Sequence, residues 1–289
     1  RDTIAHAYEL ALRDPYFKTT DDCGTVRKYL PNEPIYVVEG ENFNMKLTYL
    51  EDLFLLDKLF QLKSLQGKQD KLTEVANLSI EKKIVVVFGG SYGIGGEIVN
   101  ILTSLNGRVY SFSRSENGVD VTNKQKVQEA LQSVYEKEGR IDAIVNTAGV
   151  LIKEPLCSMS DQSIQTSIDV NLLGVVNVAQ SAFKYLKETR GSLLFYTSSS
   201  YTRGRMMYSL YSATKAAIVN FTQAIAEEWG DLHIRVNCIN PERTKTPMRI
   251  QNFGNEPDDT LLPVRDVAIA SINTIFSDAT GEIIDVRRK

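Results

Sequence analysis

Short runs of apolar, often β-branched residues alternate along most of this chain with longer segments in which apolar residues recur every three or four positions. The short runs predict buried strands near residues 83–88, 108–113, 143–146, 192–198, 234–239 and 282–286, with a further short strand near Val119. The periodic segments predict helices near residues 94–105, 124–137, 161–186, 208–229 and 263–276. Strands that alternate with helices predict an α/β fold, a doubly wound parallel sheet with helices on both faces.

The pattern of the first 66 residues differs from that of the remainder. Residues 34–40 and 44–48 predict strands, and an apolar helix is expected from residue 50 to residue 62. Residues 67–81 are charged and polar, which is typical of a linker. We therefore expect a small α/β unit over 1–66, a linker over 67–81 and the larger α/β domain over 82–289.

Composition narrows the classes of function. The net charge of -3 gives no reason to expect nucleic acid or an anionic membrane as a partner. No apolar run approaches the ~20 residues that a membrane-spanning helix needs. Cys23, Cys157 and Cys238 share no metal-ligand spacing, so we expect reduced thiols in a cytoplasmic protein. The two histidines, His6 and His233, are too scattered for a metal site, and no metal is expected.

A glycine-rich turn follows the strand at 83–88 and precedes a helix. Glycines permit a tight turn and a close approach of the backbone to a phosphate, and the helix N-terminus supplies amides and a positive dipole. An ordinary glycine-rich turn is the alternative, but the flanking strand and helix favour phosphate binding. The turn comprises Gly89, Gly90, Ser91, Tyr92, Gly93, Ile94 and Gly95.

Tyr211 and Lys215 are four residues apart on the predicted helix 208–229 and therefore share one face. A nearby cation favours phenolate over phenol, so it lowers the pKa of tyrosine toward neutral pH. Tyr211 is thus a candidate general acid. Taken alone, the pair is more simply explained as two residues that share an amphipathic helix by chance.

Several motifs together resemble the short-chain dehydrogenase/reductase family, over residues 82–286. These are the Gly-x-x-x-Gly-x-Gly turn, the segment Asn146-Thr147-Ala148-Gly149 and the pair Tyr211-x-x-x-Lys215. Asn171 matches the family's helix asparagine, and Ser198 precedes Tyr211 at the family's serine spacing, with Ser199 as the alternative. Pro241 and Thr246 match the segment after the sixth strand. The resemblance implies a Rossmann-like fold.

Three positions depart from the family's pattern. Phe88 replaces the usual threonine before the first glycine, and Thr147 replaces the second asparagine of Asn-Asn-Ala-Gly. Glu242 replaces the glycine of a Pro-Gly pair, which puts the geometry near the nicotinamide in question.

The resemblance implies specific roles. Tyr211 would protonate a ketone that receives hydride from NADPH, Ser198 would polarise the carbonyl, Lys215 would hold the nicotinamide ribose, and Asn171 would order a water. The residues expected to bind the cofactor are Gly89, Ser91, Tyr92, Gly93, Ile94, Gly95, Ser113, Arg114, Asp120, Asn146, Ala148, Gly149, Tyr211, Lys215, Pro241 and Thr246.

The second strand indicates which cofactor is preferred. NAD-binding chains place an acid about 20 residues after the glycines, where it accepts from the ribose 2′-hydroxyl. Here Ser113 stands at that position and Arg114 follows it. Arg114 can grip a 2′-phosphate, so NADP(H) is expected rather than NAD. Asp120 resembles the family's adenine contact.

The first 62 residues resemble the C-terminal end of sugar-alcohol-phosphate cytidylyltransferases. The shared features are Thr20-Asp21-Asp22, a Val-Glu-Gly turn at 38–40 and Asn44-x-Lys46-x-Thr48. The resemblance places Lys46 near a phosphate and Asp21 or Asp22 near a sugar alcohol; solvated surface charges are the alternative. The family's glycine-rich nucleotide loop is absent, so cytidylyl transfer is expected only from a full-length parent.

Together the two parts resemble bifunctional enzymes that make CDP-ribitol for bacterial surface polysaccharide. The resemblance implies a sugar-phosphate substrate, D-ribulose 5-phosphate, reduced to D-ribitol 5-phosphate. Another ketone or ketose phosphate is the first alternative, and a catalytically idle redox sensor or scaffold is the second. A homodimer or homotetramer through helices 161–186 and 208–229 is expected, with a short substrate lid between 246 and 262. The cations expected near the substrate phosphate are Arg203, Arg205, Lys153 and Arg243, and Lys245 and Arg249 on the lid side border the same place.

Overall fold

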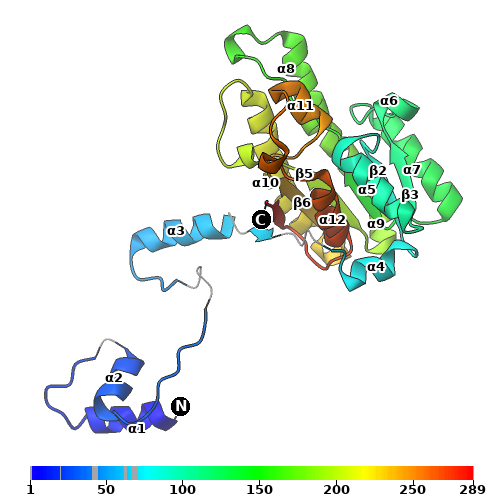
Figure 1. The fold of residues 1–289 in the computed structure, drawn as a ribbon. Helices are drawn as coiled ribbons and strands as arrows, with labels where there is room; N and C mark the ends of the chain where they lie inside the picture. The colour runs from blue at the N-terminus through cyan, green and yellow to red at the C-terminus, as the bar shows by residue number, and fades with distance from the viewer. Residues whose placement is uncertain (1, 20, 41–44, 62–63, 67–70, 289) are drawn as a thin grey trace. The chain divides into compact units, whose positions relative to one another are not determined.

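The computed structural model describes residues 2–19, 21–40, 45–61, 64–66 and 71–288, with only the backbone described at 54, 57–61 and 64–66. The chain forms two compact units, Arg1–Leu62 and Lys63–Lys289 (Figure 1). Each unit is considered by itself.

The second unit is built on a parallel sheet in the order β1-β7-β6-β5-β4-β2-β3. All six of the longer strands predicted from the sequence are confirmed, and a further short strand, β1, pairs with β7 at the edge. The strand order reverses direction between β2 and β4, and this switch point is where doubly wound sheets bind ligands. The strands are β1 (Ser64–Gln66), β2 (Ile84–Phe88), β3 (Arg108–Phe112), β4 (Ala143–Asn146), β5 (Ser192–Tyr196), β6 (Arg235–Pro241) and β7 (Ile283–Val286).

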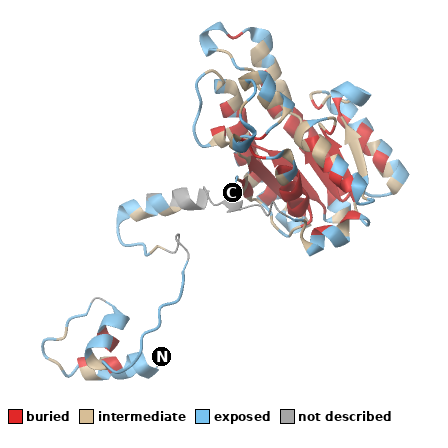
Figure 2. Ribbon diagram, in the orientation of Figure 1, coloured by how far each residue is buried: buried red, intermediate tan, exposed pale blue. Residues whose placement is uncertain are grey.

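Both faces of the sheet are covered, so its central strands are buried throughout (Figure 2). Side chains of alternate residues point to opposite faces. Ile84, Val86 and Phe88 belong to one apolar cluster, and Val85 and Val87 belong to the other. Two-sided burial explains why these strands have continuous apolar sequences rather than alternating ones.

Helices predicted from the apolar periodicity are present at the expected places. The segment predicted as one helix over 161–186 contains a π-helical turn, Asp169–Leu173, between α8 and α9. Such turns occur often at functional sites. The helices are α5 (Gly93–Ser104), α7 (Lys124–Glu138), α8 (Asp161–Ile168), α9 (Gly174–Thr189), α10 (Ser209–Glu228) and α12 (Val264–Ile275).

The strand predicted near Val119 is wrong. The chain forms a single helical turn there, α6 (Arg114–Asn117), capped by the Ser113 hydroxyl and ended by Gly118 in the left-handed conformation. Val119 follows as a loop residue in the described structure. Local capping thus prevails over the β-branched character of this short segment.

The segment expected to be a linker contains α4 (Glu74–Ile80). Thr73 caps this helix, and its Ala76 and Ile80 are buried in the second apolar cluster. The side chain of Asn273 on α12 accepts from the Thr73 amide and donates to the Lys71 carbonyl. Residues 71–82 therefore pack as part of the second unit.

The segment expected to be a lid contains another helix, α11 (Pro247–Phe253). Thr246 caps it by accepting a hydrogen bond from the Arg249 amide, and Pro247 occupies its first turn. Both are helix-starting signals that the polar composition of the segment obscured.

The first unit contains three helices among its described residues: α1 (Asp2–Ala11), α2 (Asp22–Tyr29) and α3 (Leu50–Gln61). The predicted helix 50–62 is confirmed as far as it is described. The strand predicted over 34–40 is wrong, since these residues have no strand partner in the described part of the unit; Val37 and Val38 are 95% and 84% exposed. Of the strand predicted over 44–48, residues 45–48 are irregular and residue 44 lies outside the description.

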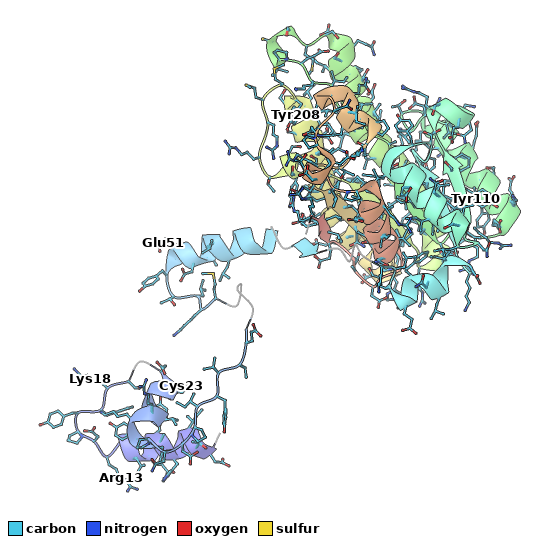
Figure 3. All side chains as sticks on the ribbon, in the orientation of Figure 1. Arg13, Lys18, Cys23, Glu51, Tyr110 and Tyr208 are labelled. Carbon is cyan, nitrogen blue, oxygen red and sulfur yellow. The ribbon has the colours of Figure 1, made fainter. Side chains whose placement is uncertain are left out.

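Asp21 and Asp22, expected near a sugar alcohol, take part in the fold of this unit. Asp21 caps α2 by accepting from the Gly24 amide, and Asp22 accepts from the Tyr8 hydroxyl. Cys23 on α2, labelled in Figure 3, is exposed. Across both units, no described helix is long and apolar enough to cross a membrane.

Candidate active site

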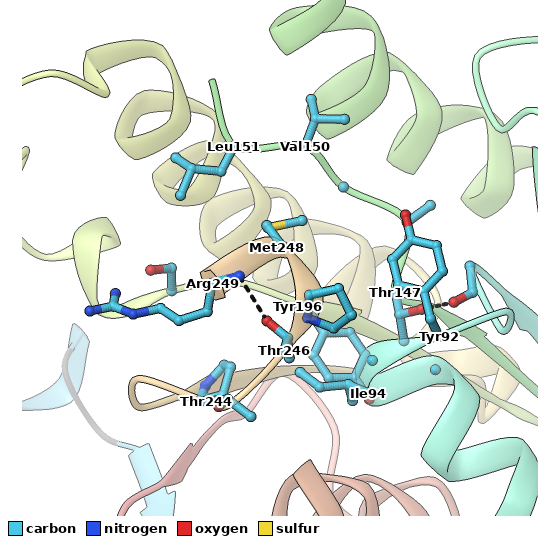
Figure 4. A pocket seen from close by; sticks show the side chains of 18 of the residues that line it. Tyr92, Ile94, Thr147, Val150, Leu151, Tyr196, Thr244, Thr246, Met248 and Arg249 are labelled. Atoms are coloured by element: carbon cyan, nitrogen blue, oxygen red, sulfur yellow. Dashed lines mark hydrogen bonds between the residues drawn. The ribbon is translucent and has the colours of Figure 1, made fainter. Parts of the chain in front are cut away.

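A cleft of about 770 Å³ opens at the carboxyl ends of the central strands. The glycine turn, the segment after β5 and α11 all line it, and the turn lies against the start of α11: a Cβ at Gly93 would be 3.8 Å from the Thr246 side chain. Figure 4 shows Tyr92 and Thr147 on one side of the view and Arg249 on the other, with Ile94 near Thr246 between them. The cleft lies where a doubly wound sheet binds its ligand.

The glycine turn is held in a shape that larger residues could not adopt. Gly89 and Gly93 have φ angles of +80° and +61°, in the left-handed region. A Cβ at Gly95 would lie 2.3 Å from the Gly89 carbonyl oxygen. Because Gly95 is in the first turn of α5, the helix can begin directly against the turn and present its free amides to the cleft.

Thr147, one of the departures from the family pattern, stabilises this turn. Its hydroxyl lies 3.0 Å from the Phe88 carbonyl oxygen and 2.9 Å from that of Gly89, and can donate to either. Phe88, a second departure, is buried and stacks on Phe112 with ring centroids 5.8 Å apart. Both substitutions therefore have partners within the fold.

Three serine hydroxyl groups lie close together at the end of β3. The Ser115 hydroxyl donates to that of Ser91 over 3.3 Å and lies 3.4 Å from that of Ser113. Arg114 is exposed between them and lines the cleft. Asp120 also lines it, and its carboxylate accepts from the Thr122 amide and hydroxyl.

Ser198, Tyr211 and Lys215 are brought together from β5 and α10. All three line the cleft, and the Lys215 ammonium lies 5.5 Å from the centre of the Tyr211 ring. Lys215 is 6% exposed and donates to the Tyr196 carbonyl oxygen over 2.9 Å. Its own carbonyl accepts from the Thr197 hydroxyl, so the end of β5 and the middle of α10 are tied together.

Burial is the largest cause of the pKa shifts of Tyr211 and Lys215. It raises the pKa of Tyr211 to about 12, against a lowering by its hydrogen bond with Ser198. It lowers the pKa of Lys215 to about 8, because the ammonium loses water. The pKa of Tyr211 is thus raised and not lowered as expected from Lys215; the charge that acts against the rise is that of Arg249.

Asn171 lies within the π-helical turn and is 1% exposed. Its side chain accepts from the Val150 amide and donates to the Val150 carbonyl, each over 2.9 Å. It therefore fixes the backbone beside Gly149, which lines the cleft. Asn146 is buried under the same segment, where its side chain accepts from the Ala148 amide.

The cations expected near a substrate phosphate separate into two groups. Arg205 and Arg243 line the cleft, whereas Arg203 and Lys153 are outside its lining. The Lys153 ammonium lies 4.7 Å over the ring of Phe253, which does line it. The remaining predicted residues that line the cleft are Gly89, Ser91, Tyr92, Gly93, Ile94, Gly95, Ser113, Ala148, Gly149, Pro241 and Thr246.

Several cleft residues were not among the predicted site residues. Tyr208, labelled in Figure 3, packs edge-on against both Tyr211 and Phe253 and forms an aromatic wall. Arg287 also reaches the cleft, from the segment after β7, and the expected lid cation Arg249 stacks over Phe253 at 3.8 Å. Arg287 could have been predicted because it follows a parallel strand, and the carboxyl ends of parallel strands lie along the same edge of the sheet. No local sequence pattern indicates that Tyr208 or Phe253 belongs to the site.

Comparison with known proteins agrees with this fold. The family model for short chain dehydrogenases matches residues 83–257, more than half of the chain. The bifunctional ribulose 5-phosphate reductase/CDP-ribitol pyrophosphorylase Bcs1 of Haemophilus influenzae is 48% identical over 285 residues, which cover 98% of this chain. The chain spans 60% of that protein's length.

Solved structures share the same architecture. The aldohexose dehydrogenase of Thermoplasma acidophilum superposes with a TM-score of 0.64 at 25% identity, over 72% of this chain and 93% of that one. ElxO with NADP bound gives a TM-score of 0.65 at 24% identity, over 71% of this chain and 97% of that one. The second likeness concerns the fold alone.

Proposed function

Because the chain belongs to the short-chain dehydrogenase family, we propose that it is an NADPH-dependent reductase that converts D-ribulose 5-phosphate to D-ribitol 5-phosphate. The observation that carries the proposal is the grouping of Ser198, Tyr211 and Lys215 in one cleft that is also lined by Arg205, Arg243, Arg249 and Arg287. The relative matched over nearly the whole chain is named a ribulose 5-phosphate reductase, which supports this choice of substrate.

The protonation of the site suits reduction. With a pKa of about 12, Tyr211 holds its proton at neutral pH and can donate it to the carbonyl oxygen as negative charge develops there. The Ser198 hydroxyl can donate to the same oxygen and polarise the carbonyl. Lys215 would hold ribose hydroxyls beside this centre, and Asn171 would order a water near it. When bound, the cofactor supplies the hydride.

The residues present fit NADP(H). The free amides of α5 and the left-handed glycines suit a pyrophosphate. The hydroxyls of Ser91, Ser113 and Ser115 with the guanidinium of Arg114 suit a 2′-phosphate, and no carboxylate stands at the Ser113 position to repel it.

The first unit supports a second activity in a longer protein. We infer that the first unit, residues 1–62, belongs to a cytidylyltransferase domain and that the second unit, which includes β1 and α4, is the reductase domain. Support comes from the match to Bcs1, which extends over 98% of this chain and whose name includes CDP-ribitol pyrophosphorylase. In such a protein the reductase would make the acceptor for cytidylyl transfer in the cytoplasm, as capsule biosynthesis requires.

Self-association through the helices of 161–186 and 208–229 is also proposed. Ile168 and Leu173 on the first of these segments are 37% and 44% exposed, which leaves apolar surface for a partner copy. Sedimentation equilibrium of the purified chain distinguishes a dimer or tetramer from a monomer.

The test of the proposed function is a screen of NADPH oxidation against pentulose and hexulose phosphates and their dephosphorylated forms. D-Ribulose 5-phosphate is expected to give the highest kcat/KM, with ribitol 5-phosphate as product. A clear preference for xylulose 5-phosphate would reject the ribitol assignment. Equal kcat/KM for ribulose and ribulose 5-phosphate would reject phosphate recognition, and no oxidation with any ketose would reject the reductase.

A further inference from the structure

Three arginines that follow neighbouring strands line the cleft. Arg243 and Arg287 come within two residues of the ends of β6 and β7, whereas Arg205 comes nine residues after β5, beyond the short turn Ser199–Tyr201. Because parallel strands lie about 4.8 Å apart, the chain leaves β6 and β7 at neighbouring points of the sheet edge. A fourth arginine, Arg249, enters from α11.

The four guanidiniums differ in how far their donors are already used. Arg249 gives both Nε and Nη2 to the Glu256 carboxylate, at 2.6 and 2.8 Å, and Arg243 lies 3.8 Å from the same carboxylate. These two arginines hold the segment after α11 in place. Arg205 has no carboxylate partner in the described part of the chain; its nearest polar contact is the Ser199 hydroxyl at 3.5 Å.

The Arg287 guanidinium contacts a carboxylate through one of its terminal nitrogens. Its Nη2 contacts the Asp285 carboxylate at 3.1 Å, and that carboxylate also accepts from the Asn240 side chain of β6 over 2.6 Å. A guanidinium carries five N–H donors, so most of them remain available to a ligand. Asp285 therefore orients the Arg287 guanidinium without using all of its N–H donors.

Glu242 fixes the backbone on either side of Arg287. Its amide donates to the Val286 carbonyl over 2.9 Å, and its carboxylate accepts from the Arg288 amide over 2.8 Å. Neighbouring residues of an extended segment point to opposite sides, so Arg288 is exposed and outside the cleft lining while Arg287 is in it. The glycine that the family pattern has at position 242 could not make the side-chain contact.

Arg205 and Arg287 line the same cleft, as do Ser198 and Ser199. Arg205 contacts Ser199, the first residue of the short helical turn Ser199–Tyr201. Burial is the main cause that raises the pKa of Tyr201 at the end of this turn, and the charges of Asp285 and Arg287 act on it in opposite directions.

We propose that Arg287 is a specificity-determining residue that receives the substrate phosphate together with Arg205, and that Glu242 is its positioning residue. The inference rests on the proposed function and deepens it. The oxygens of a phosphate ester accept hydrogen bonds from several directions. Two guanidiniums that come from different segments of the chain can therefore both donate to it.

The first experiment compares Arg287→Ala with its neighbour Arg288→Ala, which removes the same charge outside the cleft. For ribulose 5-phosphate, Arg287→Ala should lower kcat/KM by about 10- to 100-fold, mainly through KM, because a charge-assisted contact is lost. Its kcat/KM for ribulose and its affinity for NADPH should stay within about twofold of wild type, and Arg288→Ala should resemble wild type throughout. An equal loss with both ketoses, or an equal loss of NADPH affinity, overturns the inference.

The positioning role has its own test. Glu242→Ala should raise the KM for ribulose 5-phosphate with little change in kcat, whereas Glu242→Gln keeps an oxygen that can accept from the Arg288 amide and should restore KM. If Glu242→Gln and Glu242→Ala behave alike, Glu242 does not act through this hydrogen bond.

A binding measurement separates this inference from the proposed function. Inorganic phosphate is titrated calorimetrically into protein saturated with NADPH, so that the 2′-phosphate site is filled. Wild type and Arg288→Ala should bind phosphate, and Arg287→Ala should bind it about tenfold more weakly or not at all. If ribulose 5-phosphate is not reduced but this difference persists, the substrate is wrong and the phosphate site stands. Equal binding by all three proteins overturns the site whatever the substrate.

Discussion

Lys215 is expected to make the stability of this protein depend on pH in a specific window. Burial lowers the pKa of Lys215 from 10.5 to about 8. The protonated form therefore favours the unfolded chain, so the cost is fully present below pH 8 and disappears as the pH rises toward 10.5. The difference, 10.5 − 8 = 2.5, corresponds to a cost on the order of 3 kcal/mol when the ammonium is fully charged.

The perturbation is Lys215→Met, which keeps the length of the side chain and removes the titrating group. Linkage with these two pKa values gives a rise of about 1.3 kcal/mol in the wild-type free energy of unfolding between pH 7 and pH 9, relative to the variant. Burial raises the pKa of Tyr211 and of Cys238 to about 12, but both groups are present in both proteins and their effects largely cancel.

The assay is urea unfolding of wild type and Lys215→Met at pH 7, 8 and 9, with Lys187→Met as the matched control. Lys187 is exposed on α9, so its removal should give a difference that does not change with pH. If the difference between wild type and Lys215→Met is also constant to within about 0.3 kcal/mol, the ammonium is not desolvated as described and the reasoning is refuted.

Two further predictions concern turnover and cofactor choice. Tyr211→Phe should reduce the turnover of NADPH by at least about 100-fold, since the phenol supplies the proton, while the NADPH dissociation constant measured by fluorescence stays within about threefold; retention of more than a tenth of wild-type turnover would show that another group is the acid. Arg114→Ala should weaken NADPH by about 100-fold through the lost charge-assisted contact and leave NADH nearly unchanged, and equal weakening in the same titration would show that Arg114 does not contact the 2′-phosphate.

The sheet could be predicted from sequence because a strand that is buried on both faces needs apolar residues at nearly every position. β2 is apolar from end to end and β5 is apolar after Ser192, and no residue of either strand is exposed. The grouping of Ser198, Tyr211 and Lys215 could be predicted because motif order fixes which strand end and which helix face meet. Nothing comparable marks residues 34–40, whose β-branched composition suits a strand but whose pairing depends on a neighbour that local sequence does not specify.

The protonation of the site was harder to predict than its composition. Spacing along a helix shows that Lys215 and Tyr211 share a face, but it does not show how much water either side chain retains. Burial is the largest cause of both pKa shifts and moves each group toward its neutral form. The substrate cations were difficult for a related reason: Arg203 and Arg205 are two residues apart in sequence, yet only Arg205 lines the cleft.

The three departures from the family pattern now have distinct physical explanations. Phe88 is buried and stacks on Phe112 in the core. The Thr147 hydroxyl donates to the backbone of the glycine turn, so both residues stabilise the part of the fold that is expected to bind the cofactor. Glu242 lines the cleft, and its carboxylate accepts from the amide next to Arg287. A carboxylate that replaces glycine next to the reacting centre would be a liability if it faced the cleft unpaired. Held by the Arg288 amide, it instead becomes the means by which the last strand contributes a cation to the substrate end.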